Sequence, residues 1–355
     1  MKIGIFDPYL DDLGGGEKYM MTIAECLSKK HQVTVFWDNK EDIEKILKRF
    51  SIDLSNVSIS KNIFSSRVNV FNRMIETKNY DAIIFLSDGS IPSSLSKKLF
   101  IHFQSPITNI NVNGFKNKIK MSRVSGIFCN AYYTKNYIDK TFDTNSYVLY
   151  PPVSINIKNI KKENIILHVG RFRVKNVGIG DYKKQGILIQ AFKEMVDKGL
   201  KNWRFILAVG VSDEDEELFS LMQKEAKGFP IEFLVNRDNN ELWEIYSRAK
   251  IYWHASGFGE DLKIHPEYAE HFGISTVEAM GAGAVPVVIN AGGQKEIVED
   301  GRNGLLWNTL AELQDKTLEL IKDNSLLEKL SIAANERATF FSQKRFCDEL
   351  EKIIK

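Results

Sequence analysis

Short apolar runs alternate with amphipathic stretches along almost the whole chain of 355 residues. Runs such as Lys2–Phe6 (KIGIF), residues 80–86 (YDAIIFL) and residues 284–290 (AVPVVIN) are apolar and rich in β-branched side chains. Such runs are typical of strands buried on both faces of a parallel sheet. The stretches between them have helical periodicity, as in residues 17–29. This alternation predicts an α/β protein built from β-α-β units.

The same pattern divides the chain into two halves of similar construction. Further strands are predicted at residues 31–36, 100–106, 126–131 and 146–149, and then at 164–170, 203–209, 231–235 and 251–256. Further helices are predicted at residues 187–197, 241–249, 275–281, 310–321, 325–339 and 342–355, whereas 41–78 look like helix and irregular connection. Two prolines in residues 150–153 (YPPV) interrupt the alternation and predict a linker. We therefore expect domains at 1–153 and 154–341.

Composition places the chain among soluble globular proteins, with 43% hydrophobic and 26% charged residues. No run of eighteen apolar residues or signal-peptide pattern occurs, so neither a secretory leader nor a membrane-spanning helix is predicted. Cys26, Cys129 and Cys347 are few, odd in number and far apart, and no CxxC pair or His/Cys cluster suggests a metal. These features predict a reducing, cytoplasmic setting.

The charge is unevenly distributed although the net charge is only +2. Residues 61–140 hold twelve Lys or Arg against four Asp or Glu, and residues 201–300 hold nine against eighteen. A basic region indicates an anionic partner. Charges that merely keep each half in solution explain the asymmetry equally well.

The most informative stretch is residues 270–293, which read EHFGISTVEAMGAGAVPVVINAGG. A turn at Gly273 opens a short helix whose first backbone N–H groups, those of residues 273–276, have no partner within the helix and suit a phosphate. Glu270 and Glu278 flank these groups, and carboxylates accept hydrogen bonds from the hydroxyls of a sugar or ribose. A diphosphate beside hydroxyl-binding groups predicts a nucleotide-sugar site.

A second glycine-rich segment follows the first strand. Gly14, Gly15 and Gly16 lie between strand and helix, where glycine permits positive φ and close approach of a ligand. The dinucleotide fingerprint is not met, because its third glycine would fall on Tyr19. A nicotinamide site is therefore excluded, while a plain tight turn remains an alternative to a ligand-binding loop.

With HFG between the two carboxylates, the spacing E-x7-E and the downstream AVPVV, GG and EIVEDG segments resemble glycosyltransferase family 4, whose members retain anomeric configuration. The resemblance covers nearly all of the second half with specific motifs and the first half more loosely. It implies the GT-B architecture, in which two doubly wound Rossmann-like domains face a cleft. The final helix, residues 342–355, is then expected to cross back onto the first domain.

The resemblance also implies roles for particular residues. Glu270 would lie beside the transferred sugar and Glu278 would hold the ribose. Arg171 and Lys183 would bind the diphosphate, although the insertion before the helix leaves Lys183 and Lys184 as alternatives. His102, at the end of a strand, would lie near the sugar and acceptor, with a buried core histidine as the alternative. Further donor-binding residues would be Gly15, Gly16, Asn236, Arg237, His271, Phe272, Gly273, Ile274, Ser275 and Thr276. His254 and His265 are expected to be structural.

The implied activity is a retaining transfer of a hexose from a nucleoside-diphosphate sugar to a hydroxyl of a glycan or lipid-linked acceptor, with the leaving phosphate acting as the base. GDP-mannose is favoured as donor, while UDP- and dTDP-sugars stay open. No cofactor and no metal are expected, and an anionic membrane surface suits the basic half better than nucleic acid. A nucleotide-sugar epimerase of the same fold and a non-catalytic nucleotide-sugar-binding protein are the alternatives. A phosphorylase would need a pyridoxal-phosphate lysine, which nothing indicates.

Overall fold

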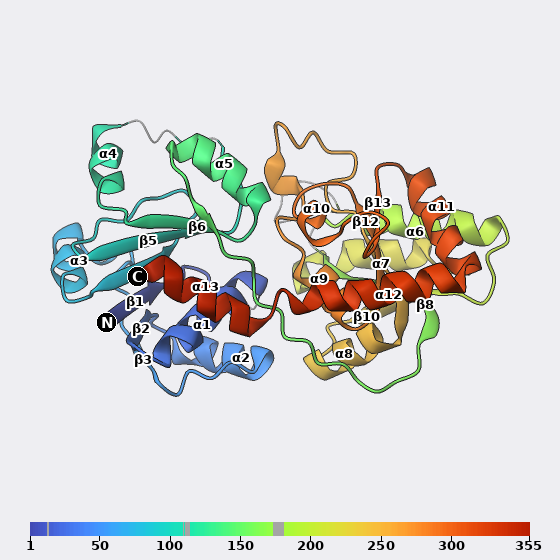
Figure 1. Cartoon of the computed structure of the whole chain (residues 1–355), viewed down its shortest axis with the longest axis horizontal. Coiled ribbons are helices and arrows are strands. Elements are labelled where there is room, and N and C mark those ends of the chain that lie inside the picture. Colours follow the sequence, from blue (N-terminus) through green and yellow to red (C-terminus); the bar gives the residue numbers. More distant parts are fainter. Residues whose placement is uncertain (13, 109, 111–113, 173–180) are drawn as a thin grey trace. The chain divides into compact units, whose positions relative to one another are not determined.

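The structure is a computed structural model that describes residues 1–12, 14–108, 110, 114–172 and 181–355 (Figure 1). It divides into two compact units, which we call unit 1 (Met1–Pro152 with Gln343–Lys355) and unit 2 (Val153–Ser342). Each expected domain boundary, after residue 153 and before residue 342, lies one residue from these divisions. Most of the expected loop at residues 173–182 lies outside the described residues.

Unit 1 is a seven-stranded parallel sheet in the order β3-β2-β1-β4-β5-β6-β7. Its strands are β1 Lys2–Phe6, β2 Gln32–Phe36, β3 Val57–Ser60, β4 Ala82–Leu86, β5 Lys98–Phe103, β6 Gly126–Cys129 and β7 Tyr147–Val148. Its helices are α1 Gly15–Ser28, α2 Lys40–Phe50, α3 Val70–Thr77, α4 Phe115–Met121, α5 Tyr132–Phe142 and α13 Gln343–Ile354.

The central strands of unit 1 are buried on both faces, as their unbroken apolar runs predict. In β4, Ala82 and Ile84 pack into one core with α1, α2 and α13, while Ile83 and Phe85 face a second core on the other side of the sheet. The predicted strand at residues 31–36 begins one residue later than expected. β3 was not predicted, because this edge strand (VSIS) alternates half-buried and exposed positions and contains no apolar run.

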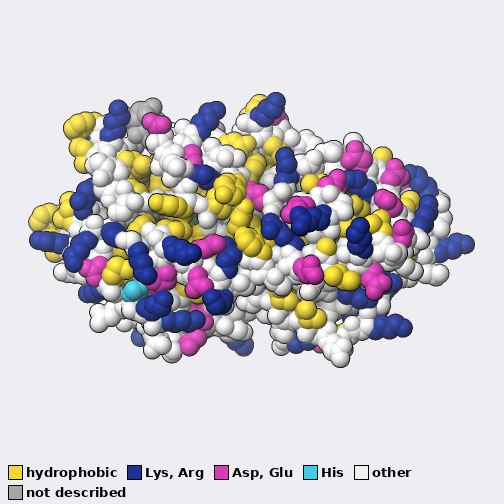
Figure 2. Space-filling model, viewed as in Figure 1, with side chains coloured by type: hydrophobic (Ala, Val, Ile, Leu, Met, Phe, Trp, Pro, Cys, Tyr) yellow, Lys and Arg dark blue, Asp and Glu magenta, His cyan; other side chains and the backbone are white. Residues whose placement is uncertain are grey.

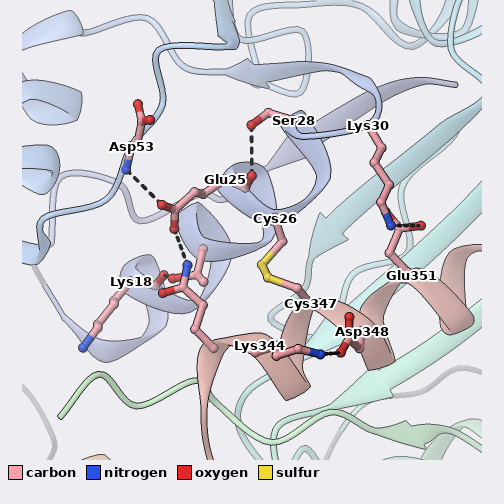
Figure 3. Close-up of a disulfide and its surroundings, with 12 residues drawn as sticks. Lys18, Glu25, Cys26, Ser28, Lys30, Asp53, Lys344, Cys347, Asp348 and Glu351 are labelled. Atoms are coloured by element: carbon pink, nitrogen blue, oxygen red, sulfur yellow. Dashed lines mark hydrogen bonds and ion pairs between the residues drawn. A yellow bond between two sulfur atoms is a disulfide. The ribbon is translucent and has the colours of Figure 1, made fainter.

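The C-terminal helix α13 belongs to unit 1, where Phe346, Leu350 and Ile354 enter the core beneath α1. This packing brings Cys347 beside Cys26 of α1, and the two form a disulfide (Figure 3). This pairing was not foreseen from the sequence, in which the three cysteines are scattered. Separation in sequence does not prevent pairing once the last helix returns to the first.

Unit 2 is a six-stranded parallel sheet in the order β10-β9-β8-β11-β12-β13. Its strands are β8 Glu163–Phe172, β9 Arg204–Val211, β10 Ile231–Val235, β11 Ala249–His254, β12 Val285–Ile289 and β13 Leu305–Trp307. Its α-helices are α6 Gln185–Asp197, α7 Glu216–Glu225, α8 Asn239–Arg248, α9 Ile274–Gly281, α10 Gln294–Ile297, α11 Leu310–Lys322 and α12 Asn324–Thr339.

Both units have the doubly wound strand order, in which the chain winds outward in both directions from a central pair of strands. The predicted α/β class with two doubly wound domains is confirmed. In unit 2 that central pair is β8 and β11. Ligands of open α/β sheets bind at the carboxyl ends of such a pair. No helix among the described residues is both long and apolar enough to span a bilayer.

Candidate functional site

The carboxyl ends of β8 and β11 bring together residues that are far apart in the sequence. β8 ends with Arg171 and Phe172, and β11 ends with His254. Lys183 follows β8, and the segment that carries Glu270 follows β11. These residues surround the switch point of the unit 2 sheet, where the fold itself favours a ligand.

Lys183 and Glu270 form a largely buried ion pair there. The distance from Lys183 Nζ to Glu270 Oε2 is 2.7 Å, and the two side chains are only 18% and 19% exposed. The ring of Tyr182 packs against the ammonium at 4.9 Å from the ring centroid. The structure therefore joins two residues that lie 87 positions apart and that we had assigned to one site from motifs alone.

The pKa values indicate that both partners carry their charge. Burial raises the pKa of Glu270, but the charge of Lys183 and hydrogen bonds from His254 and Lys183 outweigh it and hold the pKa well below its usual range. Burial lowers the pKa of Lys183, yet the charge and hydrogen bond of Glu270 outweigh it and raise the pKa. The positive charge of Arg171 opposes that of Lys183, and its smaller effect lowers the pKa of this lysine.

His254, which the sequence led us to expect as a structural residue, contacts the same carboxylate. Its Nε2 lies 3.0 Å from the same oxygen, Glu270 Oε2, and its side chain is 1% exposed. Burial lowers the pKa of His254, which favours the neutral ring. Since a carboxylate accepts hydrogen bonds, a proton on Nε2 fits this contact. The sequence signal was available, because His254 ends a strand that precedes the 270–278 motif.

Lys184 makes a different ion pair, with Glu260. Its backbone is left-handed, with φ of +56°, and it is the residue that precedes α6. Asp181 accepts hydrogen bonds from the amides of Gln185 and Gly186 at 2.6 and 2.7 Å. The N-terminus of α6 is thus already covered by a carboxylate, which disfavours a phosphate at that helix.

The N-terminus of α9 is open by comparison. Gly273 precedes the helix with φ of +114°, and no side chain among the described residues caps it. Ser275 Oγ lies 2.8 Å from the Tyr252 hydroxyl. The Thr276 hydroxyl is buried and lies near the same Tyr252 hydroxyl. This uncapped helix N-terminus, whose first residue follows Glu270 by four positions, suits a phosphate group.

The glycine pair after β12 holds this segment in place. The Gly293 amide donates to the Glu270 carbonyl at 2.8 Å. A Cβ on Gly293 would lie 2.3 Å from the His271 carbonyl oxygen, and one on Gly292 would lie 2.3 Å from the Glu270 carbonyl oxygen. Both positions therefore require glycine, because the two backbones touch.

Glu278 lies on α9 and accepts a hydrogen bond from the buried Tyr246 hydroxyl of α8 at 3.0 Å. Lys162 donates to carbonyl groups at the ends of both helices, Ala249 at 2.7 Å and Ala282 at 2.6 Å. Burial lowers the pKa of Lys162 to about 8. This lysine fixes α8 and α9 together and so positions the Glu278 carboxylate.

Other residues of unit 2 that were predicted to bind the nucleotide sugar make contacts within the protein instead. The Asn236 side chain both donates to and accepts from the backbone of Val211, at 3.0 and 2.9 Å. Arg237 pairs with Glu241 on the surface at 3.0 Å. The Phe272 ring packs in the core against Phe341, so only its backbone can face a ligand.

His271 Nε2 lies 3.1 Å from the Glu267 carbonyl. The Ile274 side chain is half-buried at the start of α9. We therefore ascribe the affinity of residues 271–276 for an anion to their backbone amides. His265 is exposed and pairs with Glu267, in keeping with a structural role.

His102 of unit 1 lies in the core and not at a surface that a substrate could reach. His102 is fully buried between Tyr19 and Phe128, with ring centroids at 4.3 and 4.6 Å, and burial lowers its pKa to about 3. The ring of His102 has no exposed surface in this structure, which favours the core-histidine alternative over contact with a sugar.

The Gly15 and Gly16 loop is also partly occupied. The amide of Gly14 donates to the Glu17 carboxylate at 2.6 Å, which places negative charge at the N-terminus of α1. A Cβ on Gly16 would lie 2.3 Å from Gln104 Oε1, so close packing requires this glycine. An acidic N-terminus disfavours a phosphate, and we do not assign the donor diphosphate to this loop.

Comparison with known proteins identifies the family. The family model described as "Glycosyl transferases group 1" matches residues 153–337, more than half of the chain. The chain belongs to this family. The matched segment coincides with unit 2 and contains the Lys183–Glu270–His254 cluster and Glu278.

Curated relatives of this group 1 chain are glycosyltransferases. It is 26% identical over 304 residues to "GDP-Man:Man(3)GlcNAc(2)-PP-Dol alpha-1,2-mannosyltransferase" of Dictyostelium discoideum, which covers 79% of this chain and 56% of that protein. The chain thus spans about half the length of the first curated relatives it matches. It is also 25% identical over 384 residues to "GalNAc-alpha-(1->4)-GalNAc-alpha-(1->3)-diNAcBac-PP-undecaprenol alpha-1,4-N-acetyl-D-galactosaminyltransferase" of Campylobacter jejuni, over 100% of this chain and 98% of that protein.

Solved structures share the fold of this group 1 chain. A glycosyltransferase from Rickettsia africae matches with a TM-score of 0.75 at 13% identity, over 100% of this chain and 97% of that one. Anabaena Alr3699/HepE in complex with UDP matches with a TM-score of 0.72 at 18% identity, over 99% of both chains. The expected GT-B fold and the expected transferase family are confirmed. The epimerase alternative gains no support.

Proposed function

We propose that this chain transfers a hexose from a nucleoside-diphosphate sugar to a hydroxyl of a glycan or lipid-linked acceptor, with retention of anomeric configuration. The observation that carries the proposal is the Lys183–Glu270–His254 cluster beside the open N-terminus of α9. A buried cation, a carboxylate and free helix amides at one switch point match the parts of a sugar diphosphate.

In this proposal Arg171, Lys183 and the first amides of α9 hold the diphosphate. Their positive charge stabilises the departing nucleoside diphosphate, where negative charge develops as the glycosidic bond breaks. Glu270 receives hydroxyls of the transferred sugar, and the neutral ring of His254 keeps that carboxylate oriented. Glu278 accepts hydrogen bonds from the ribose.

Retention is proposed to follow attack of the acceptor on the same face as the leaving group. A phosphate oxygen of the departing diphosphate then takes the proton of the acceptor hydroxyl. Lys183 and Arg171 keep that oxygen in place while the bond to the sugar breaks. The Glu270 carboxylate acts on sugar hydroxyls and needs no covalent bond to the sugar.

The finer assignments rest on relatives. GDP-mannose is our proposed donor, since the Dictyostelium relative is named as a GDP-mannose-dependent mannosyltransferase. A lipid-linked acceptor is supported by names that specify PP-Dol and PP-undecaprenol. UDP is bound in the Anabaena structure, so a uridine donor is the specific competitor to test. We further propose contact with a membrane at its cytoplasmic face.

The test is release of nucleoside diphosphate from GDP-mannose, UDP-glucose, UDP-N-acetylglucosamine and dTDP-rhamnose, with polyprenyl-diphosphate-linked glycans as acceptors. We expect one donor to turn over. Nuclear magnetic resonance of the product should show the same anomeric configuration as in the donor. Glu270→Gln should abolish turnover, and His254→Phe should lower kcat more than it changes KM. Donor interconversion without acceptor would instead indicate an epimerase, and binding without turnover a binding protein.

A further inference from the structure

Helix α3 of unit 1 turns its apolar side chains outward. Val70, Phe71 and Ile75 are 52%, 72% and 49% exposed. The side of the helix opposite Phe71 and Ile75 is anchored instead, since Thr77 is buried and Arg73 donates to backbone carbonyls between residues 63 and 68. A surface helix normally buries its apolar face, so this orientation is the reverse of the usual one.

Helix α4 repeats the arrangement. Phe115 and Ile119 lie one helical turn apart, on one face, and are 79% and 53% exposed. Phe115 and Phe71 are the two most exposed large apolar side chains in the described part of the chain. Both helices therefore present apolar residues to solvent, and in each the most exposed of these is a phenylalanine.

The two helices approach one another through a short segment before β5. The amide of Leu95 donates to Thr77 Oγ1 at 3.0 Å, next to the end of α3. The Arg123 guanidinium, just beyond α4, donates to the Ser96 carbonyl at 2.9 Å. Leu95 is itself 40% exposed. We call the surface formed by Val70, Phe71, Ile75, Leu95, Phe115 and Ile119 the outer face of unit 1.

Most of the charge in the segments that form the outer face is positive. Residues 67–123 contain nine Lys or Arg against three Asp or Glu, and one of these three, Asp81, is paired with Lys97. Lys116 and Lys118 extend from α4 itself and are exposed. In Figure 2, yellow apolar and dark blue basic side chains mingle at the end of unit 1 where Figure 1 shows α3 and α4. Exposed aromatic residues among lysines fit the boundary between lipid headgroups and acyl chains.

We propose that the outer face of unit 1 docks on an anionic lipid bilayer, with Phe71 and Phe115 entering the boundary and the lysines contacting headgroups. This inference rests on the lipid-linked acceptor and the membrane contact of the proposed function. It names the surface and the lipid charge that the chain requires.

Charge complementarity favours a bilayer over a second copy of the chain or a nucleic acid as the partner of the outer face. A second copy bound by twofold symmetry through this face would bring Lys116 and Lys118 of both copies into one interface, which is repulsive. Nucleic acid would satisfy the lysines but leave Val70, Ile75 and Ile119 in water. An anionic bilayer satisfies both kinds of residue at once.

The experiment is cosedimentation of the full chain with vesicles of phosphatidylcholine alone and of equal parts phosphatidylcholine and phosphatidylglycerol. We expect strong binding to the vesicles that contain phosphatidylglycerol and little binding to the vesicles of phosphatidylcholine. Phe71→Ser with Phe115→Ser should weaken it by about tenfold for each side chain. Lys116→Gln with Lys118→Gln should weaken it by about fivefold for each charge, and added salt should do the same. Leu221→Ser with Ile332→Ser and Lys224→Gln with Lys227→Gln are matched controls on unit 2.

Three results would overturn the inference: no vesicle binding, equal binding to neutral vesicles, or equal binding by every variant. Light scattering adds a fourth, since self-association lost in the phenylalanine variant would assign the face to a second copy. Nucleoside diphosphate binding by all variants, measured without lipid, should be unchanged. Failure of docking and failure of the donor site are therefore separate results.

Discussion

Lys183→Met tests the cluster at the centre of the proposed site. Methionine keeps much of the length of the side chain but removes the ammonium that lies 2.7 Å from Glu270 Oε2. The carboxylate then stays buried with His254 as its remaining partner. Removing one member of a buried pair costs about 3–5 kcal/mol, and less where water reaches it. With about one fifth of each side chain exposed, we expect about 2–3 kcal/mol.

That loss corresponds to a fall of about 4–12 °C in the unfolding midpoint of a domain of this size. The pH dependence follows from the two pKa directions. Glu270 has a depressed pKa, so its contribution is present above the unfolded value of about 4.3 and disappears as pH falls through the folded value. Lys183 has a raised pKa, so its contribution disappears only as pH rises through a folded value above about 10.4.

The assay is thermal unfolding between pH 3 and pH 9, with nucleoside diphosphate binding measured at pH 7. Lys184→Met is the control, because its ion pair with Glu260 is equally buried but separate from Glu270. Both variants should be less stable, whereas only Lys183→Met should lose about tenfold or more in diphosphate affinity. The reasoning is refuted if Lys184→Met loses that affinity instead, or if the Lys183→Met stability loss does not shrink in acid.

Three further variants test the supports of the site and of unit 1. Glu278→Ala should lower the affinity for a ribonucleoside diphosphate by about tenfold but leave the affinity for its 2′,3′-dideoxy analogue unchanged. An equal loss of affinity for both would show that Glu278 does not bind the ribose. Gly293→Ala should destabilise by more than about 2 kcal/mol, since its Cβ would meet the His271 carbonyl, whereas Gly114→Ala meets nothing within 4 Å and should be nearly neutral. Cys347→Ser should destabilise by about 3–5 kcal/mol without reductant, and dithiothreitol should bring the parent chain to the same midpoint; identical parent midpoints with and without reductant would contradict this.

Much of the fold was predictable because apolar runs mark the buried strands of parallel sheets. β1 and β10 have the predicted bounds, and β4 and β12 differ by two residues or fewer at each end. β3 and β13 were missed, since β3 (VSIS) contains no apolar run and β13 has only three residues. Position at a sheet edge is not the reason, because the edge strand β10 was predicted with its correct bounds.

The site was predictable where a motif fixed it and not where tertiary packing decides. Glu270 and Lys183 followed from motifs, whereas the role of His254 depends on β11 ending beneath Glu270. His102 occupies a strand end that resembles a site position, yet Tyr19 and Phe128 cover it completely. The pairing of Cys26 with Cys347 depends likewise on where α13 packs.

The most direct test of the central claim is calorimetric titration of the purified chain with GDP, UDP and dTDP, each with and without magnesium. The proposed site predicts that one of the three binds clearly and that Arg171→Ala and Glu278→Ala each weaken it. Binding of GDP would support the mannose assignment, and binding of UDP would replace it with a uridine-linked sugar. If none of the three binds at millimolar concentration, with or without a lipid-linked acceptor present, unit 2 is not a nucleotide-sugar site.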